Sequence, residues 1–303
     1  MSTDLAFLFP GQGSQYVGMG ADLPTAAEVF DRADRLLGFA LSRLCLEGPA
    51  EALDDTVNTQ PAILAVSVAA LEALRERLGP PRWVAGHSLG EFSALVAAGA
   101  LTFEDALHLV RERGRLMKEA GQRSPGGMAA VIGLERETVG RICAQISEQS
   151  SAHVGIANDN CPGQIVISGD EGALQAALAA LSAAGARRAV RLAVSIAAHS
   201  PLMAGAAAEF RKVLDGVAIR PPQVTFVANA TAGPLSDPDE IRQALGRQLT
   251  SPVHWNDSMR WIIGQGAARF VEVGPGDVLS GLLKRIDPTV ERRTTAQLLL
   301  EEG

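Results

Sequence analysis

Short apolar runs alternate with longer segments of helical periodicity in the first part of the chain. The runs DLAFLF (residues 4–9) and PRWVAGHS (residues 81–88) are typical of buried strands, and each leads into a glycine-containing turn. Proline suits a first helical turn, so we expect a long helix to begin near Pro61. A second helix is expected to begin at Ser88, and a third to follow Thr102, a suitable N-cap.

The order of the expected elements changes between residues 126 and 194, where strand and helix patterns follow one another as β-α-β-β-α-β. This order is the signature of a ferredoxin-like module. The expected elements are strand 126–133, helix 135–150, strands 152–160 and 163–170, helix 171–185 and strand 186–194.

Helix and strand patterns then alternate again, with helices expected at 200–216 and 237–250 and strands at 223–229 and 268–276. The sequence therefore predicts an α/β core that is interrupted by a small inserted subdomain. We assign residues 1–125 and 195–303 to the core and residues 126–194 to the ferredoxin-like insert.

Composition narrows the classes of protein to which the chain can belong. The net charge is −7 and no long run of Lys or Arg is present, which argues against nucleic-acid binding. No apolar run reaches the ~18 residues that a membrane span requires, and the N-terminus lacks the basic segment of a secretory signal. The three cysteines are far apart and lack metal-ligand spacing, as expected for reduced thiols in a cytoplasmic protein.

The most specific chemical pattern is Gly86-His87-Ser88-Leu89-Gly90, which matches the G-x-S-x-G turn of serine nucleophiles. It lies between an expected strand and an expected helix, where glycines let the turn close tightly. Ser88 Oγ is then exposed at the helix N-terminus, whose dipole favours developing negative charge. The backbone N–H of Leu89 is placed to donate to an oxyanion. The alternative is a chance Gly-Ser-Gly turn without chemistry.

A serine nucleophile needs a base, and the chain has five histidines. We favour His199, in VSIAAHSPLM, because it lies where the chain returns from the insert to the core. Such junction loops lie over the strand ends at which ligands bind in α/β folds. A loop histidine with a structural role is the alternative. The other four are expected to point away from the serine or to lie outside the site: His87, His108, His153 and His254.

A basic residue falls in the apolar stripe of the helix expected after Thr102. On a helical wheel Arg113 lies among apolar residues, whereas most of its charged neighbours fall on the opposite side. A buried guanidinium cannot lose its charge and needs an anion partner. The interpretations are an internal salt bridge, a side chain that reaches out to solvent, or a bidentate receptor for a substrate carboxylate.

The loop FPGQGSQYVGMG suggests a dinucleotide-binding turn at first sight, but Tyr16 stands where the third glycine of G-x-G-x-x-G is required. Because this loop follows the first strand, it can lie beside the serine turn instead. The backbone N–H of Gln12 is then a candidate for a second oxyanion donor. A glycine turn with only a structural role is the alternative.

Together these segments resemble the malonyl-CoA:acyl carrier protein transacylases and the acyltransferase domains of polyketide synthases. The matching segments occur in family order and cover nearly the whole chain: FLFPGQGSQYVGMG, NTQPAILA, GHSLGEFSALVAAGAL, VRERGRLMKEA, GGMAAVIG, VSIAAHSPLM, QLTSPVHW and FVEVGPGDVLSGLLKRI. The resemblance implies an α/β-hydrolase-like core with an inserted ferredoxin-like subdomain. That implied fold agrees with the fold that the periodicity predicts.

The resemblance also implies a role for individual residues. Ser88 is the acylated nucleophile and His199 its base. The remaining roles are oxyanion donors at Gln12 and Leu89, substrate-binding side chains at Arg113, Gln60, Met117 and Ala198, and a backbone carbonyl at Gln248 that orients the histidine. One departure is Ala198, where many malonyl-specific members carry a larger residue. Its small side chain puts the exclusion of 2-substituted malonyl groups in question.

The implied reaction moves a malonyl group from coenzyme A to the phosphopantetheine thiol of acyl carrier protein through a serine ester, without metal or redox cofactor. It serves fatty acid or polyketide synthesis, and a monomer is expected. Because carrier proteins are acidic, we expect docking at a basic cluster, with Lys118, Arg123, Arg187 and Arg188 as candidates. An acyl-thioester serine hydrolase and a non-catalytic carrier-protein-binding module are the alternatives.

Overall fold

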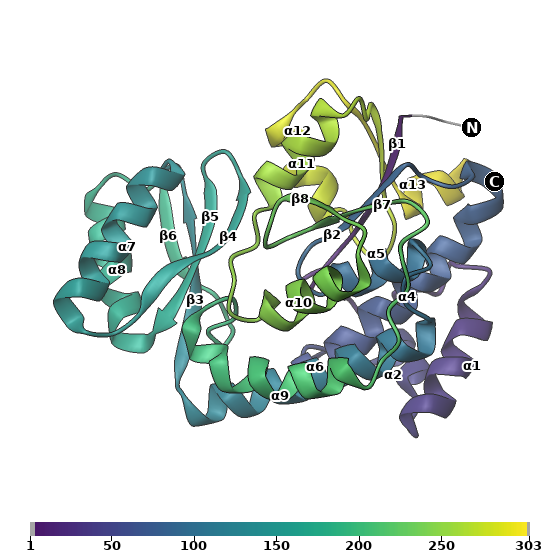
Figure 1. The fold of residues 1–303 in the computed structure, drawn as a ribbon, viewed down its shortest axis with the longest axis horizontal. Helices are drawn as coiled ribbons and strands as arrows, with labels where there is room; N and C mark the ends of the chain where they lie inside the picture. Colours follow the sequence, from purple (N-terminus) through teal and green to yellow (C-terminus); the bar gives the residue numbers. More distant parts are fainter. Residues whose placement is uncertain (1–3, 302–303) are drawn as a thin grey trace.

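A computed structural model describes residues 4–301 and contains two β-sheets with helices packed on both (Figure 1). Within the described residues the larger sheet has the strand order β10-β9-β1-β2-β7-β8. All neighbouring pairs in it are parallel except β7 and β8. Its strands are β1 (Leu5–Phe9), β2 (Trp83–Gly86), β7 (Thr225–Ala228), β8 (Gly233–Leu235), β9 (Arg269–Glu272) and β10 (Glu291–Thr294).

Strand β1 is buried on both faces, and its alternating side chains join two separate hydrophobic clusters. Leu5, Phe7 and Phe9 point into the larger cluster, whereas Ala6 and Leu8 point into the other. This explains why the strand reads as a continuous apolar run, since a parallel sheet covered by helices has no polar face. Phe9 pairs with Gly86 at the carboxyl ends of β1 and β2, so the loops that follow both strands begin at the same edge.

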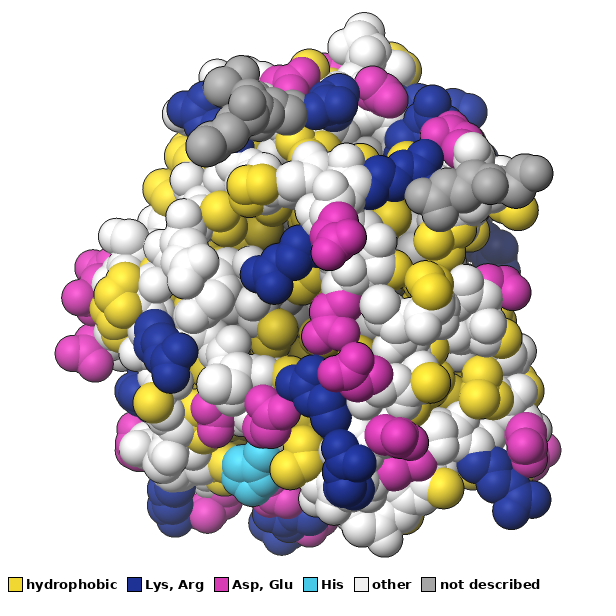
Figure 2. Space-filling model, turned by 90° about the vertical axis from the view of Figure 1, so that its right-hand side faces the viewer, with side chains coloured by type: hydrophobic (Ala, Val, Ile, Leu, Met, Phe, Trp, Pro, Cys, Tyr) yellow, Lys and Arg dark blue, Asp and Glu magenta, His cyan; other side chains and the backbone are white. Residues whose placement is uncertain are grey.

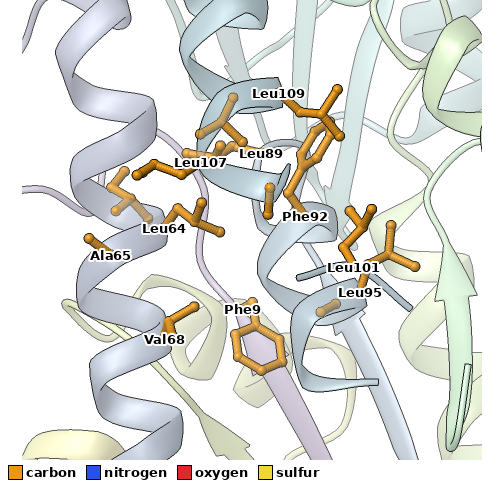
Figure 3. Close-up of a cluster of buried hydrophobic side chains, with 14 of the residues drawn as sticks. Phe9, Leu64, Ala65, Val68, Leu89, Phe92, Leu95, Leu101, Leu107 and Leu109 are labelled. Carbon is orange, nitrogen blue, oxygen red and sulfur yellow. The ribbon is translucent and has the colours of Figure 1, made fainter. Parts of the chain in front are cut away.

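Helices cover both faces of the larger sheet. Leu64 and Val68 of one helix and Phe92 and Leu95 of another pack with Phe9 in the larger cluster (Figure 3). The helices of the core are α1 (Ala26–Leu37), α2 (Leu41–Glu47), α3 (Ala50–Leu53), α4 (Thr56–Leu78), α5 (Gly90–Ala97), α6 (Phe103–Arg123), α9 (Ala204–Asp215), α10 (Pro238–Gln248), α11 (Trp255–Gly264), α12 (Val278–Ile286) and α13 (Thr295–Leu300), with a 3₁₀ turn at Pro201–Met203.

Helix α4 is long and apolar enough to cross a membrane, but 72% of its most apolar 18-residue stretch is buried inside the protein. It is therefore a core helix. It begins at Thr56 with Asp55 as N-cap, so the expectation that it starts near Pro61 was wrong. Proline inside a helix leaves the carbonyl four residues earlier without its donor. Here that carbonyl, of Val57, accepts a 2.8 Å hydrogen bond from Arg111 Nη1, which compensates for the missing N–H.

The second sheet has the strand order β4-β5-β3-β6 and is antiparallel throughout, as the β-α-β-β-α-β pattern predicts. Figure 1 shows this sheet beside the larger one, with its helices on the far side. Its elements are β3 (Gly126–Ile132), α7 (Arg136–Ser150), β4 (Val154–Cys161), β5 (Gln164–Asp170), α8 (Glu171–Ala183) and β6 (Arg188–Arg191). The domain boundaries placed at residues 125/126 and 194/195 stay a prediction.

A short parallel bridge ties this second sheet to the core. It pairs Asn158 of β4 with Val253, a residue of the loop between α10 and α11. The Asp159 N–H donates to the Val253 carbonyl at 2.9 Å, and the Val253 N–H donates to the Ala157 carbonyl at 2.8 Å. The loop that carries Val253 is therefore held in register with strand β4.

Candidate active site

The turn at Ser88 is strained and tightly packed. Ser88 has φ 52°, in the left-handed region that non-glycine residues rarely adopt. A Cβ atom on Gly86 would lie 1.9 Å from the carbonyl carbon of Gly90, and one on Gly90 would lie 2.1 Å from the carbonyl oxygen of Phe9. Glycine is thus required at both positions. Helix α5 begins at Gly90, two residues later than expected, because the left-handed Ser88 cannot belong to the helix.

Asn229, which follows strand β7, holds the turn from the side. Its Oδ1 accepts the Ser88 N–H at 2.7 Å, and its Nδ2 donates to the Gly86 carbonyl at 2.6 Å. The Ser88 amide is therefore engaged within the protein. Sequence reasoning missed Asn229, because it lies 141 positions from Ser88 and no local motif marks it.

His199 lies beside Ser88. Its Nε2 is 2.9 Å from Ser88 Oγ, and its Nδ1 is 2.9 Å from the Gln248 carbonyl and 3.0 Å from the Ser251 carbonyl. Two carbonyls can only accept, so Nδ1 carries the proton and Nε2 is free to accept from the serine hydroxyl. The structure thus brings together the three residues expected from the sequence, and it adds the Ser251 carbonyl.

The histidine is held neutral. Burial lowers the pKa of His199 to about 3, with the positive charge of Arg113 as the next contribution in the same direction, while the carbonyls of Gln248 and Ser251 oppose it. His199 also has φ 60°, so both members of the serine–histidine pair adopt left-handed backbone conformations. Such strain persists only where the surroundings fix it.

The other histidines do not contact Ser88 Oγ. His87 Nε2 is 2.8 Å from Asn160 Oδ1, and its ring meets Trp255 edge to face. His108 is exposed on α6, and His153 precedes β4. His254 is half-buried, and its Nδ1 lies 3.5 Å from Arg136 Nη2.

Arg113 is 2% exposed, which excludes the interpretation that its side chain reaches solvent. Its Nη2 donates to Ser88 Oγ at 3.0 Å and to Gln248 Oε1 at 2.8 Å, and its Nε donates to the same oxygen at 3.0 Å. It forms no ion pair within 4.0 Å with any carboxylate among residues 4–301, although the charge of Glu91 raises its pKa. Burial lowers the pKa of Arg113 to about 10, which leaves it charged at neutral pH.

Gln60 contacts Arg113 from behind. Its Oε1 accepts from Arg113 Nη1 at 2.9 Å, and its Nε2 lies 3.3 Å from the Met117 sulfur. Gln60 is fully buried and does not line the cavity described below, whereas the expectation placed it in the site lining. Helix α4 carries it in the layer beneath the guanidinium, so it contacts Arg113 rather than the cavity.

A cavity of about 270 Å³ opens in front of Ser88, between the core, the second sheet and α12. Met117 and Ala198 both line it, and their role in substrate binding stays a prediction. Gln12 and Leu89 both belong to its wall, and their backbone N–H groups donate to no protein acceptor within the described part of the chain. Free N–H groups beside a nucleophile can stabilise an oxyanion. Polar side chains from the second sheet complete the wall: Asn158, Asn160 and Gln164.

The four basic residues expected to bind a carrier protein do not form one cluster. Lys118 pairs with Asp55, and Arg123 pairs with Glu119 before β3 begins. Arg188 pairs in the sheet with Ile132, the last residue of β3, at the other end of that strand. The face turned away from the second sheet mixes acidic and basic side chains (Figure 2). The expectation of one basic cluster was therefore wrong, because the order of helices and strands along the chain does not give the distances between these residues in the fold.

The parallel sheet, the strained serine turn and the serine–histidine pair beside a cavity define an α/β enzyme of the serine-dependent class. Residues 6–296 match the acyl transferase domain family. The chain is 45% identical over 287 residues to the malonyl CoA-acyl carrier protein transacylase of Bacillus subtilis, covering 93% of this chain and 90% of that protein. It belongs to the malonyl-CoA:acyl carrier protein transacylases.

Solved structures agree with this assignment. The acyl carrier protein S-malonyltransferase of Vibrio cholerae has a TM-score of 0.93 and 42% identity, covering 97% of this chain and 98% of that chain. A malonyl-transacylase in complex with a type II polyketide synthase acyl carrier protein has a TM-score of 0.94 and 42% identity, covering 99% and 100%. The predicted fold class, an α/β core with a small antiparallel second sheet, is confirmed.

Proposed function

We propose that this enzyme transfers a malonyl group from coenzyme A to acyl carrier protein, with Ser88 as the transient carrier. The observation that supports it most is that Ser88 Oγ lies 2.9 Å from a neutral histidine and 3.0 Å from a buried guanidinium. The histidine suits proton transfer, and the guanidinium suits a substrate that carries a second carboxylate. The named activity of the Bacillus subtilis relative is the same.

In the first half-reaction Ser88 Oγ attacks the thioester carbonyl while its proton passes to His199 Nε2. The tetrahedral oxyanion accepts hydrogen bonds from the N–H groups of Gln12 and Leu89. The carbon–sulfur bond then breaks, His199 returns the proton to the thiolate, and coenzyme A leaves. The malonyl group remains on Ser88 as an oxygen ester.

In the second half-reaction the phosphopantetheine thiol of acyl carrier protein takes the place of coenzyme A. His199 removes the thiol proton, the sulfur attacks the ester carbonyl, and the proton returns to Ser88 Oγ as the carbon–oxygen bond breaks. The same oxyanion donors serve both steps, because each passes through a tetrahedral intermediate at the same carbon.

Arg113 binds the malonyl carboxylate. In the free enzyme its Nη2 donates to Ser88 Oγ and to a side-chain amide oxygen. These neutral acceptors can give way to a carboxylate, which accepts two charge-assisted hydrogen bonds from one guanidinium. An acyl-thioester hydrolase would use the same serine and histidine, but it would have no use for a cation held at the nucleophile.

The enzyme also accepts 2-substituted malonyl groups in this proposal. Ala198 lies in the cavity wall next to His199, and its methyl group leaves room where a larger residue would stand. Ala198→Phe is expected to slow methylmalonyl transfer much more than malonyl transfer. If the wild-type enzyme gains no methylmalonyl mass, the proposed tolerance is wrong and the malonyl activity is unaffected.

The deciding experiment is intact-mass spectrometry after mixing with malonyl-CoA. The wild-type enzyme should gain one malonyl group and lose it on addition of holo acyl carrier protein, whereas Ser88→Ala should gain none. A Ser88→Ala variant that still gains the malonyl mass would place the nucleophile elsewhere. A malonyl-enzyme that water discharges as fast as carrier protein does would favour the hydrolase.

A further inference from the structure

The carboxylate of Glu91 is buried beneath the serine turn, and neither the catalytic steps nor substrate binding uses it. It lies in the first turn of α5 and is 2% exposed. Its Oε1 accepts the Asn229 N–H at 2.7 Å, and its Oε2 accepts a hydrogen bond from Gln248 Nε2. Both neighbours are donors, so both oxygens act as acceptors. Burial raises the pKa of Glu91 to about 7, while the hydrogen bonds from Asn229 and Gln248 and the charge of Arg113 favour the ionised form.

The Gln248 side chain links this carboxylate to Arg113. Its Nε2 donates to Glu91 and, at 2.9 Å, to the Ser88 carbonyl, while its Oε1 accepts from Arg113 Nε and Nη2. All hydrogen-bonding positions of the amide are therefore used. An amide turned by 180° would set its NH₂ against the guanidinium and its oxygen against the carboxylate. Glu91 therefore acts with the guanidinium and the Ser88 carbonyl to hold the amide in the orientation that presents its oxygen to Arg113.

We propose that Glu91 is a positioning residue for substrate selectivity, which acts through the Gln248 amide to aim Arg113 at the acyl group on Ser88. This inference rests on the proposed malonyl transfer. Gln248 serves two functions in this arrangement. Its backbone carbonyl fixes the tautomer of His199, and its side chain fixes the direction of Arg113. One residue therefore sets the base and the carboxylate receptor in a constant relation.

Glu91→Gln is the variant that tests the proposal, because it keeps the size and removes one obligatory acceptor. The oxygen of the new amide meets the Asn229 N–H, so its NH₂ group faces Gln248 Nε2. Two donors then oppose each other, and the Gln248 amide is no longer held firmly with its oxygen towards Arg113. We expect the KM for malonyl-CoA in Ser88 acylation to rise about tenfold, the equivalent of one charge-assisted hydrogen bond at ~1.4 kcal/mol per tenfold. Acetyl-CoA has no carboxylate, so its acylation should stay within about twofold.

Three further variants separate a positioning role from a role in folding. Gln248→Met keeps the backbone carbonyl for His199 but loses the amide, so it should show the same selective loss of malonyl acylation. Glu112→Gln, a partly exposed carboxylate on α6, is the matched control and should change neither substrate. In an Arg113→Ala background, Glu91→Gln should cause no additional loss for malonyl-CoA, because its effect passes through Arg113.

Rates should be measured by quenched-flow intact mass, with the melting temperature of every variant. Malonyl and acetyl acylation that fall in parallel in Glu91→Gln would overturn the inference, as would an additive loss in the Arg113→Ala background. Failure of both Glu91→Gln and Gln248→Met to fold would assign the cluster to stability and overturn it too. A wild-type enzyme that gains no malonyl mass would instead overturn the proposed function.

Discussion

Replacing Arg113 by alanine is expected to invert the preference of the enzyme between malonyl-CoA and acetyl-CoA. The guanidinium lies 3.0 Å from Ser88 Oγ and forms no ion pair with a carboxylate among the described residues. Its charge is thus available to a substrate. Two charge-assisted hydrogen bonds at ~1.5–3 kcal/mol each correspond to about 10²–10⁴-fold in malonyl acylation. Acetyl-CoA loses no contact, so its acylation should hold steady or rise.

The assay is single-turnover acylation of Ser88 with each acyl-CoA, together with the melting temperature. Arg113→Lys keeps the charge but not the two-pronged geometry, so it should recover only part of the malonyl activity. Arg115→Ala is the matched control, because this arginine lies on the exposed side of the same helix and pairs with Glu112 and Glu119. Malonyl and acetyl rates that fall together, with a lowered melting temperature, would refute a carboxylate receptor at Arg113.

Four other outcomes follow from the site. His199→Ala should keep its fold but slow acylation ~10²–10⁴-fold, and near-normal single-turnover acylation would remove it as base. Because the pKa of His199 is lowered in the folded state, the buried neutral imidazole contributes stability that is fully present above the unfolded-state pKa near 6.5 and is lost as pH falls towards 3. Chemical denaturation should therefore show that the free energy of unfolding falls less between pH 6 and pH 4 in His199→Ala than in the wild type. An equal fall in the two proteins would contradict this. Gly90→Ala should fail to close the serine turn, since its Cβ would meet the Phe9 carbonyl, and wild-type acylation and melting temperature would contradict that. Arg285 lies on the exposed side of α12, the helix whose first turns line the cavity. Arg285→Glu should raise the KM for carrier protein at low salt more than Lys118→Glu does, because Lys118 is already ion-paired with Asp55. Equal effects of the two variants would place docking elsewhere.

Local patterns predicted the parts of the site that depend on neighbours in the chain. Ser88 follows from two glycines and a strand-to-helix turn, and Arg113 from a charged residue within an apolar stripe. Both patterns can be recognised from the sequence, because the tight turn requires glycine and a cation within an apolar stripe requires a partner inside the protein. The alternation of strands and helices likewise predicted the second sheet, because all its strands pair with one another within one continuous segment of the chain.

Contacts between distant segments left no such pattern. Asn229 and Glu91 meet across 138 positions, and neither residue type at its place is unusual for a loop or a first helical turn. The Gln248 carbonyl was expected only through the family resemblance, since every residue has a carbonyl. The start of α4 was missed for a similar reason, because the partner that compensates for Pro61 is Arg111, on another helix.

The bridge between Asn158 and Val253 makes the alignment of the histidine depend on where the second sheet stands. Val253 lies two residues after Ser251, whose carbonyl holds His199 Nδ1. A hinge motion that separates the two sheets would therefore strain the short segment that carries the Ser251 carbonyl. Hydrogen–deuterium exchange at the Asp159 and Val253 amides would report how often this bridge opens.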